Sequence, residues 1–244
     1  MADVKNSSLA TDLVSYWEFE EASGSRIDSH GSNDLTDNNT VGQATGKIGN
    51  AADLELANSE SLSITDAAQT GLDITGDFSM SLWWKPESKG TSQVFIGKWA
   101  PSNYSYGVRY QASDGFSMYN SSNGSSVFGF GSKVSHAITI GNWYHVVAVF
   151  DVSAGSCKFY IDGVDIGSST GMRTSTFNGA APFTVGKVGT ADELGDGLYD
   201  ELAVWGGRLL SAGDVSDLYN SGNGIPYEAT SLSQTARRGV VMMG

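Results

Sequence analysis

Hydrophobic and polar side chains alternate over short runs of this 244-residue chain, a pattern that predicts β-strands. The clearest run covers residues 78–84, where every second side chain is large and apolar and those between are Ser79, Ser81 and Trp83. We therefore expect this strand to have one buried face and one mixed face. Residues 143–150 are apolar at almost every position, as is typical of a central strand covered on both sides.

A hairpin and several further strands complete the predicted β-structure. Asp162-Gly163 separates the runs at 158–161 and 164–166, and it supplies the positive φ angles that a two-residue hairpin turn needs. Thirty-one glycines against four prolines fit many strands joined by tight turns. About a dozen strands imply two stacked sheets. The further strands are predicted at residues 14–19, 52–56, 61–64, 94–98, 106–111, 116–119, 183–188 and 198–205.

One short helix is predicted near the C-terminal end of the chain. Ser211 can cap it, and Asp214 stands three residues later as the capping-box partner. Val215, Leu218 and Tyr219 then form an apolar stripe at helical spacing. We expect this helix to close the domain.

The predicted elements suggest where the domain begins and ends. We divide the chain into an N-terminal arm at residues 1–9, one domain at 10–225 and a C-terminal tail at 226–244. The tail ends in an apolar run at 240–243, behind the pair Arg237-Arg238. Such a run predicts either a frayed end or a segment that docks on another surface, so homo-oligomerisation and docking on a larger assembly are both open.

Charge and cysteine content exclude several classes of function. Lys and Arg number 14 against 27 Asp and Glu, and the net charge of −13 opposes the cationic phosphate contacts of nucleic-acid binding. The single cysteine, Cys157, excludes an intramolecular disulfide and a cysteine-based zinc site. The first residues show no secretory signal pattern, and the longest apolar run, at 146–150, is too short to span a bilayer. We therefore expect neither nucleic-acid binding nor membrane insertion.

Four blocks of residues follow one another in a familiar order. They are WEFEEASG at 17–24, FSMSLWW at 78–84, WYHVVAVFD leading into FYIDG at 143–163, and GLYDELAVW at 197–205. Together they resemble the laminin-G-like domain of the concanavalin A-like lectin/glucanase superfamily, over roughly residues 10–222. The resemblance implies an all-β fold, a two-sheet antiparallel jelly-roll sandwich, with the one short C-terminal helix. The family includes lectins, adhesion modules, carbohydrate-binding domains of enzymes and virus-particle components.

The resemblance also implies a structural calcium ion. Such domains often hold one where the early loop meets the strand with the Asp-Glu pair, which here implies Asp28, Asn33 and Asp200 as ligands. Calcium takes six to eight oxygen ligands from carboxylates and carbonyls, and a Ser/Asn/Gly/Asp loop facing a strand carboxylate can provide them. The alternative is that Asp28 and Asp200 hold turns by accepting hydrogen bonds from backbone amides.

No catalytic residues are predicted. Glucanases of the superfamily place their carboxylates along one strand in a Glu-x-Asp-x-x-Glu or similar pattern, which this sequence lacks. Residues 167–171 match Gly-x-Ser-x-Gly, but no helical stripe follows them, which favours a hairpin end over a nucleophile elbow. His145 lies inside the central strand, where we expect a packed, hydrogen-bonded core residue. The chain is therefore predicted not to be an enzyme.

The segment from Trp99 to Phe130 is the strongest candidate for a ligand surface. Its aromatic residues alternate with Ser, Asn, Gly and Asp, and sugars offer C–H faces for ring stacking and hydroxyls for hydrogen bonds. The predicted glycan contacts are Trp99, Asn103, Tyr104 and Asn120. The same pattern also fits two exposed strands without a ligand, so a purely structural segment is the alternative.

These observations predict a non-enzymatic glycan-binding or adhesion protein with a lectin-like jelly roll, displayed on a larger assembly. Its partners would be glycans or cell-surface polysaccharide, with further copies or a larger assembly contacted through the tail. The alternative is a structural virus-particle component, such as a capsid decoration, fibre or tail protein, that binds no sugar. A glycoside hydrolase ranks third. The sequence fixes no location, and a virion surface or an extracellular place reached by assembly fits both leading hypotheses.

Overall fold

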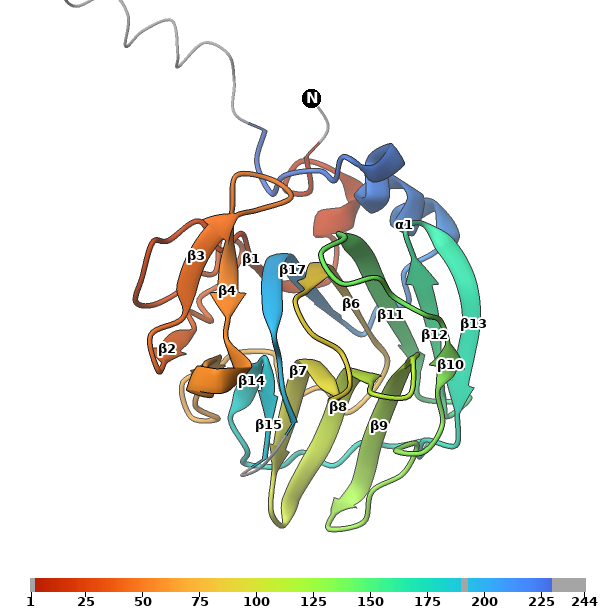
Figure 1. Ribbon diagram of the computed structural model, residues 1–244. Helices are drawn as coiled ribbons and strands as arrows, with labels where there is room; N and C mark the ends of the chain where they lie inside the picture. The colour runs from red at the N-terminus through yellow and green to blue at the C-terminus, as the bar shows by residue number, and fades with distance from the viewer. Residues whose placement is uncertain (1–2, 190–192, 230–244) are drawn as a thin grey trace, which may run out of the picture.

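Two large antiparallel sheets lie face to face in the computed structural model, which describes residues 3–189 and 193–229 (Figure 1). The eight-stranded sheet has the order β13-β12-β11-β6-β17-β4-β3, with β1 paired to β17. Its strands are β1 (Leu13–Trp17), β3 (Gly42–Thr45), β4 (Asn50–Leu54), β6 (Phe78–Pro86), β11 (Tyr144–Asp151), β12 (Ser156–Ile161), β13 (Val164–Thr170) and β17 (Gly197–Gly206).

The seven-stranded sheet has the order β10-β9-β8-β7-β14-β5-β2. Its strands are β2 (Thr36–Asn38), β5 (Ser61–Ile64), β7 (Gln93–Ala100), β8 (Asn103–Gln111), β9 (Gly115–Gly124), β10 (Val134–Ser135) and β14 (Phe183–Val185). A small separate pair joins β15 (Lys187–Val188) to β16 (Glu193–Leu194). Short 3₁₀ turns cover Ser8–Ala10, Leu56–Asn58 and Asn220–Gly222, and the helix α1 spans Ala212–Tyr219. The predicted two-sheet antiparallel sandwich with one short helix is confirmed.

The strands form where the sequence pattern predicts them, with local differences. Asp162 and Gly163 have φ angles of 52° and 79° and join β12 to β13 as the predicted tight turn. The predicted strand at 183–188 is interrupted because Gly186 has a φ of 75°, which ends β14 and starts β15. The strands β2, β3, β10 and β16 are short, and the sequence pattern did not predict them.

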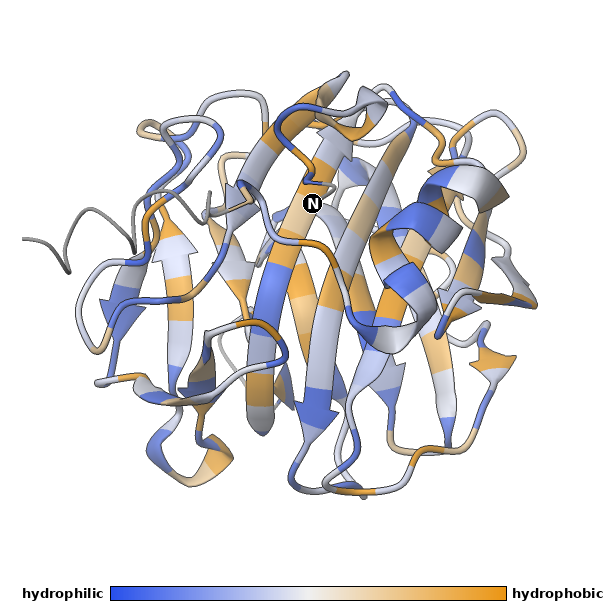
Figure 2. Cartoon of the chain, turned by 90° about the horizontal axis from the view of Figure 1, so that it is seen from above, coloured by the Kyte–Doolittle hydropathy of each residue, from blue (hydrophilic) through white to orange (hydrophobic). Residues whose placement is uncertain are grey.

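A second hydrophobic cluster covers the outer face of the eight-stranded sheet. Figure 2 views the molecule from this side, with α1 and the N-terminal segment lying across the strands. The cover reaches β11, which explains why that strand is apolar on both faces, as predicted. The buried members of the cluster are Val4, Leu9, Leu13, Tyr16, Val147, Val149, Tyr160, Ala203, Trp205, Leu210, Val215, Leu218, Ile225 and Tyr227.

The two ends of the described chain pair with each other in this cover. The backbone N–H of Val4 donates to the Pro226 carbonyl at 3.1 Å, and that of Lys5 donates to the Tyr227 carbonyl at 2.9 Å. Residues of the predicted arm and the start of the predicted tail therefore lie side by side on the domain. The apolar run at 240–243, predicted to dock on another surface, lies outside the described residues.

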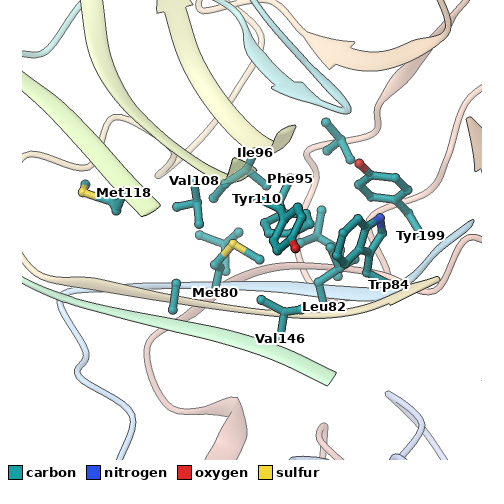
Figure 3. Packing of buried hydrophobic residues seen from close by; sticks show 14 of the residues in the cluster. Met80, Leu82, Trp84, Phe95, Ile96, Val108, Tyr110, Met118, Val146 and Tyr199 are labelled. Atoms are coloured by element: carbon teal, nitrogen blue, oxygen red, sulfur yellow. The ribbon is translucent and has the colours of Figure 1, made fainter. Parts of the chain in front are cut away.

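The main core fills the space between the two sheets (Figure 3). Every second side chain of β6 enters it, which confirms the alternation predicted for residues 78–84. Burying each large apolar side chain contributes about 1.5–3 kcal/mol, so this layer is the main source of stability. The core residues labelled in the figure are Met80, Leu82, Trp84, Phe95, Ile96, Val108, Tyr110, Met118, Val146 and Tyr199.

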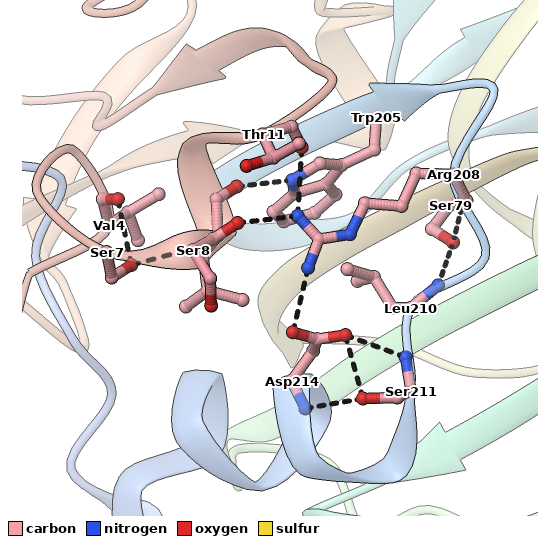
Figure 4. A network of polar contacts seen from close by, with 11 residues as sticks. Val4, Ser7, Ser8, Thr11, Ser79, Trp205, Arg208, Leu210, Ser211 and Asp214 are labelled. Atoms are coloured by element: carbon pink, nitrogen blue, oxygen red, sulfur yellow. Dashed lines mark hydrogen bonds and ion pairs between the residues drawn. The ribbon is translucent and has the colours of Figure 1, made fainter.

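A polar network ties α1 and the N-terminal segment to the eight-stranded sheet (Figure 4). Ser211 Oγ accepts the N–H of Asp214 at 3.2 Å, and Asp214 accepts the N–H of Ser211 at 2.9 Å, which confirms the predicted capping box. Arg208 donates to the Ser8 carbonyl and to Asp214, both at 2.8 Å. The Trp205 indole N–H donates to a carbonyl of the N-terminal segment at 2.7 Å. The cover is thus fixed by polar as well as apolar contacts.

No helix within residues 3–189 and 193–229 is long and apolar enough to cross a membrane.

Candidate functional site

The outer face of the seven-stranded sheet contrasts with the covered face, because small polar residues dominate it. In β8, Tyr106, Val108 and Tyr110 enter the core, so Ser105, Gly107 and Arg109 point outward. In β9, Phe116 and Met118 enter the core, and Ser117 and Tyr119 point outward. Tyr106 and Tyr110, both in the predicted glycan-binding segment, are therefore core residues.

Four aromatic rings form a row on this outer face, which we call the aromatic platform: Trp99, Tyr104, Tyr119 and Phe130. Trp99 and Tyr104 are stacked, with ring centroids 4.4 Å apart and planes at 16°. Tyr119 meets Trp99 edge-on at 4.8 Å and lies 5.3 Å from Phe130. Phe130 is 47% exposed, Trp99 and Tyr104 are half-buried, and Tyr119 is buried.

Strand register and one glycine bring these rings together. Irregular register between Lys98 and Trp99 on β7 pairs Trp99 directly with Tyr104 on β8. Gly107 pairs with Tyr119, and a Cβ at Gly107 would lie 2.5 Å from the Tyr119 ring. The absence of a side chain at Gly107 therefore lets the Tyr119 ring lie flat against β8.

An arginine stands at the polar centre of the platform. The Arg109 guanidinium lies 3.8 Å from the Phe130 ring centroid and 5.1 Å from that of Tyr119, within cation–π range of both. It donates to the Phe130 carbonyl at 3.1 Å and forms an ion pair with Glu193 of β16. The Arg109 side chain is 4% exposed and that of Glu193 is 26% exposed. The positive charge is therefore compensated within the protein.

The Tyr119 hydroxyl lies beside this pair. It is buried and has no hydrogen-bond partner among the described residues. Burial, together with the nearby Glu193 charge, raises the pKa of Tyr119, so the hydroxyl keeps its proton. A buried hydroxyl without a hydrogen-bond partner costs stability.

The structure separates the four predicted glycan contacts. Trp99 and Tyr104 belong to the platform, and half-buried Asn103 lies near it and accepts the N–H of Ala180 at 3.3 Å. Asn120 is fully buried and is not available to a ligand. It follows Phe116 and Met118 in the inward alternation of β9, and its side-chain amide holds residues 173–176 through hydrogen bonds of 2.8–3.2 Å.

Asp28 and Asn33, the predicted calcium ligands of the early loop, are hydrogen-bonded to that loop and to other segments of the chain. Asp28 Oδ1 accepts the backbone N–H groups of Tyr16, His30 and Gly31 at 2.9–3.1 Å, and Oδ2 accepts that of Asn33 at 3.0 Å. The Asn33 amide donates to a serine hydroxyl and to a carbonyl, at 2.7 and 2.8 Å. For Asp28 the structure matches the turn-holding alternative, and Asp200 likewise accepts backbone N–H groups of a turn.

Asp200, the third predicted ligand, has a neighbour that the sequence pattern did not reveal. The β17 register shifts after Asp200, and Glu201 has a φ of 51°, so both side chains face the covered side of the eight-stranded sheet. Asp200 Oδ2 accepts the N–H groups of Lys47 and Ile48 at 2.7 and 3.0 Å. Glu201 Oε2 accepts the Tyr16 hydroxyl. Oδ1 of Asp200 and Oε1 of Glu201 are buried without hydrogen-bond partners.

The electrostatics of this carboxylate pair fit a bound cation. Burial raises the pKa of Asp200 to about 8, and burial together with the Asp200 charge raises that of Glu201 well above its usual range. The ion pairs found within the described ranges include neither carboxylate. Carboxylate oxygens without hydrogen-bond partners are hard ligands of the kind that calcium prefers. Asp200 and Glu201 therefore fit the ion better than the Asn33 amide does.

A further group of carboxylates lies on the surface, where Asp53, Glu55 and Glu87 bring oxygens within 4.8 Å of one another. Exposed acidic groups of this kind are common, and we assign no function to this one.

The residues considered for catalysis are structural. Residues 167–170 belong to β13, and Gly171 follows its end, which agrees with the hairpin interpretation. His145 is 1% exposed, its Nε2 lies 2.8 Å from Ser81 Oγ, and its ring packs against those of Trp83 and Tyr219, which also stack on each other. This confirms the predicted hydrogen-bonded core residue. Burial and the Lys47 charge lower the pKa of His145 to about 3.

Comparisons with known proteins agree with this fold. A family model described as the concanavalin A-like lectin/glucanases superfamily matches residues 56–216. No curated protein matches the chain. Domain 4 of AbnA, an extracellular arabinanase from Geobacillus stearothermophilus solved with arabinotriose, is 26% identical with a TM-score of 0.62. That match covers 84% of this chain and 97% of the domain.

Two toxin binding domains share the fold at lower identity. The binding domain of Paraclostridial Mosquitocidal Protein 1 is 15% identical with a TM-score of 0.66, over 88% of this chain and 53% of that one. The binding domain of botulinum neurotoxin DC, solved with SialylT, is 14% identical with a TM-score of 0.65, over 88% and 52%. This chain spans about half the length of these toxin domains, and the likeness shows the fold alone.

Proposed function

The chain belongs to the concanavalin A-like lectin/glucanases superfamily, and from that premise we propose that it is a non-enzymatic glycan-binding domain. The observation that carries the proposal is the aromatic platform on the outer face of the seven-stranded sheet. There, Trp99, Tyr104 and Phe130 keep accessible ring surface, while the equivalent face of the other sheet is closed.

The chemistry of the platform suits a sugar. Ring faces stack against the C–H face of a pyranose or furanose, and the stacked Trp99–Tyr104 pair holds both rings in place at little entropic cost. Sugar hydroxyls donate and accept, so the Glu193 carboxylate, which is 26% exposed and paired with Arg109, provides a suitable partner. One solved relative adds support, because the arabinanase domain was solved with arabinotriose.

The location of the carboxylates favours binding over hydrolysis. Glycoside hydrolysis needs two carboxyl groups that flank the scissile bond. Asp200 and Glu201 lie under the closed cover of the eight-stranded sheet, on the opposite side of the sandwich from the platform. At the platform, the Glu193 carboxylate is held in an ion pair by Arg109. We therefore assign the platform no catalytic role.

We also propose that calcium is a structural cofactor of this domain. Asp200 and Glu201 would hold it through the two carboxylate oxygens that have no hydrogen-bond partner. The ion would neutralise two buried charges beside the turn at residues 46–49, which Asp200 already fixes through the N–H groups of Lys47 and Ile48. Its effect on a glycan would be indirect, through stability of the sandwich.

The test is a glycan array run with the native protein and two tryptophan variants. Trp99→Ala removes the central ring of the platform, whereas Trp143→Ala removes another half-buried indole that lies outside it. We expect native protein and Trp143→Ala to bind the same glycans, and Trp99→Ala to lose at least tenfold in affinity. Equal binding by all three proteins, or binding by none while all are folded, would contradict the proposal.

A further inference from the structure

We propose that the platform selects neutral glycans over anionic ones, because its central cation is already neutralised by Glu193. This inference rests on the proposed glycan-binding function and specifies the ligand class. Arg109 is the cationic side chain stacked on the platform rings, and its partners are the Phe130 and Tyr119 rings, the Phe130 carbonyl, Ser117 Oγ and the Glu193 carboxylate. The Arg109 guanidinium is thus fixed in position, and its positive charge is compensated, without any ligand.

Pairing of a ligand carboxylate with Arg109 would be energetically unfavourable. To pair with Arg109 it must displace Glu193, whose negative charge would then remain close to the incoming anion. Separating a largely buried ion pair leaves at least one charge poorly solvated, which is more costly than breaking an exposed pair. The net charge of −13 adds a long-range repulsion for any polyanion. A sialylated or uronate-containing glycan is therefore disfavoured.

A neutral sugar can use the same centre without breaking the pair. Glu193 is 26% exposed, so its carboxylate can accept a sugar hydroxyl while it stays bound to Arg109. The flanking rings of Trp99 and Phe130 then stack on the apolar faces of the sugar. The set matches a polyhydroxylated, uncharged ligand.

The experiment measures affinities of the full chain for two matched sets of oligosaccharides. The neutral set contains arabinotriose, cellotriose, mannotriose and galactotriose; the anionic set contains sialyllactose and trigalacturonate. Three proteins are compared by titration calorimetry: native, Glu193→Gln, and Glu228→Gln as a charge-matched control whose carboxylate pairs with Lys5 at the terminal segments. A thermal melt confirms that each variant is folded.

We expect the native protein to bind its best neutral probe at least tenfold more tightly than either anionic probe. Glu193→Gln leaves the Arg109 charge uncompensated, so it should raise the affinity for the anionic probes about tenfold, whereas Glu228→Gln should not. Binding of the neutral probe should change little between 20 mM and 500 mM salt, because no net charge is paired with the ligand.

The outcomes separate this inference from the proposed function. If the native protein prefers sialyllactose or trigalacturonate, and Trp99→Ala abolishes that binding, the domain binds glycans but the neutral selectivity is wrong. If Glu193→Gln and Glu228→Gln behave alike, the Arg109–Glu193 pair does not set the selectivity. If no probe binds and the glycan array is also silent, both the function and the inference fail.

Discussion

The outer faces of the two sheets are formed by the same alternation of side chains along the strands, but only one of them is covered by α1 and the terminal segments. On the eight-stranded sheet the outward residues include large apolar side chains such as Val147, Val149 and Trp205, and Trp205 is 0% exposed beneath α1 and the terminal segments. On the seven-stranded sheet they are mostly small and polar, and the aromatic Phe130 stays 47% exposed. Large apolar side chains at outward positions thus favour a cover formed by the chain itself, and on the other sheet the Phe130 ring stays exposed.

The ionisable groups follow the same division. On the covered face, Asp200, Glu201 and His145 are buried. Burial raises the pKa of the two carboxyl groups and lowers that of the imidazole, so it favours the neutral form of each group. On the open face, Arg109 and Glu193 neutralise each other. Burial on the covered face therefore links stability to pH, while the open face carries an ion pair whose charges compensate each other.

The largest expected effect comes from removing one tryptophan on each face. Trp205→Ala should lower the free energy of unfolding by about 3–5 kcal/mol, because it leaves a cavity in the second cluster and removes the indole bond to the N-terminal segment. Trp99→Ala should cost less than about 1.5 kcal/mol, since its ring is half-buried and loses mainly aromatic contacts. Urea unfolding measures the free energy of unfolding of both variants. Equal losses of this free energy would contradict the expected difference between the two faces.

Calcium should act on the covered face alone. At about 100 times its Kd, calcium should stabilise the native protein by roughly 2.7 kcal/mol relative to chelator, as any ligand of the folded state does. Asp200→Asn should abolish this gain, because it removes a proposed ligand, while the surface control Glu87→Gln should retain it. Thermal melts in calcium and in EGTA measure both. The same calcium gain in Asp200→Asn would exclude the proposed site.

The buried imidazole predicts a stability loss in acid. His145 stays neutral in the folded protein down to a pKa of about 3, whereas the unfolded chain takes up this proton below about pH 6.5. Stability should therefore fall as the pH decreases from about 6.5 toward 3, by up to about 1.4 kcal/mol per pH unit. The comparison with His145→Gln isolates this group from Asp200 and Glu201, whose raised pKa values act in the opposite direction. A pH-independent difference between the two proteins would contradict the assignment.

The smallest effect concerns the helix of the cover. Ser211→Ala removes the side-chain acceptor for the Asp214 N–H and should lower the free energy of unfolding by about 1 kcal/mol. Glycan affinity should not change, because α1 lies on the covered side of the sandwich. Urea unfolding and one binding titration are sufficient, and a loss of affinity in this variant would couple the two faces.

The sequence pattern predicted most of the fold because the long strands carry their own signal. Every second residue of 78–84 is large and apolar, and Asp162-Gly163 identifies a turn without reference to the rest of the chain. The strands that it missed, such as β10 with only Val134 and Ser135, are too short for periodicity to appear. They form because a neighbouring strand offers hydrogen bonds, which is a tertiary effect.

The candidate site was predictable only in part. Trp99 and Tyr104 stood out by composition, but Asn120 looked equivalent until the inward alternation of β9 placed it in the core. Glu193 lies 84 residues from Arg109 in sequence, so no local pattern connects the two. Glu201 was not predicted as a site residue, because strict alternation puts adjacent residues on opposite faces of a strand. Only the positive φ at Glu201 turns both carboxylates to one side.

The most direct test follows the six indole N–H signals of the protein by two-dimensional NMR during a glycan titration. The titrant is the glycan that binds best on the array, and single variants assign the peaks. We expect the Trp99 signal to move most, while the signals of Trp83 and Trp205 on the covered face stay in place. Movement of the Trp83 or Trp205 signals with a stationary Trp99 signal would show that the glycan binds elsewhere. It would contradict the proposal that the aromatic platform binds the glycan.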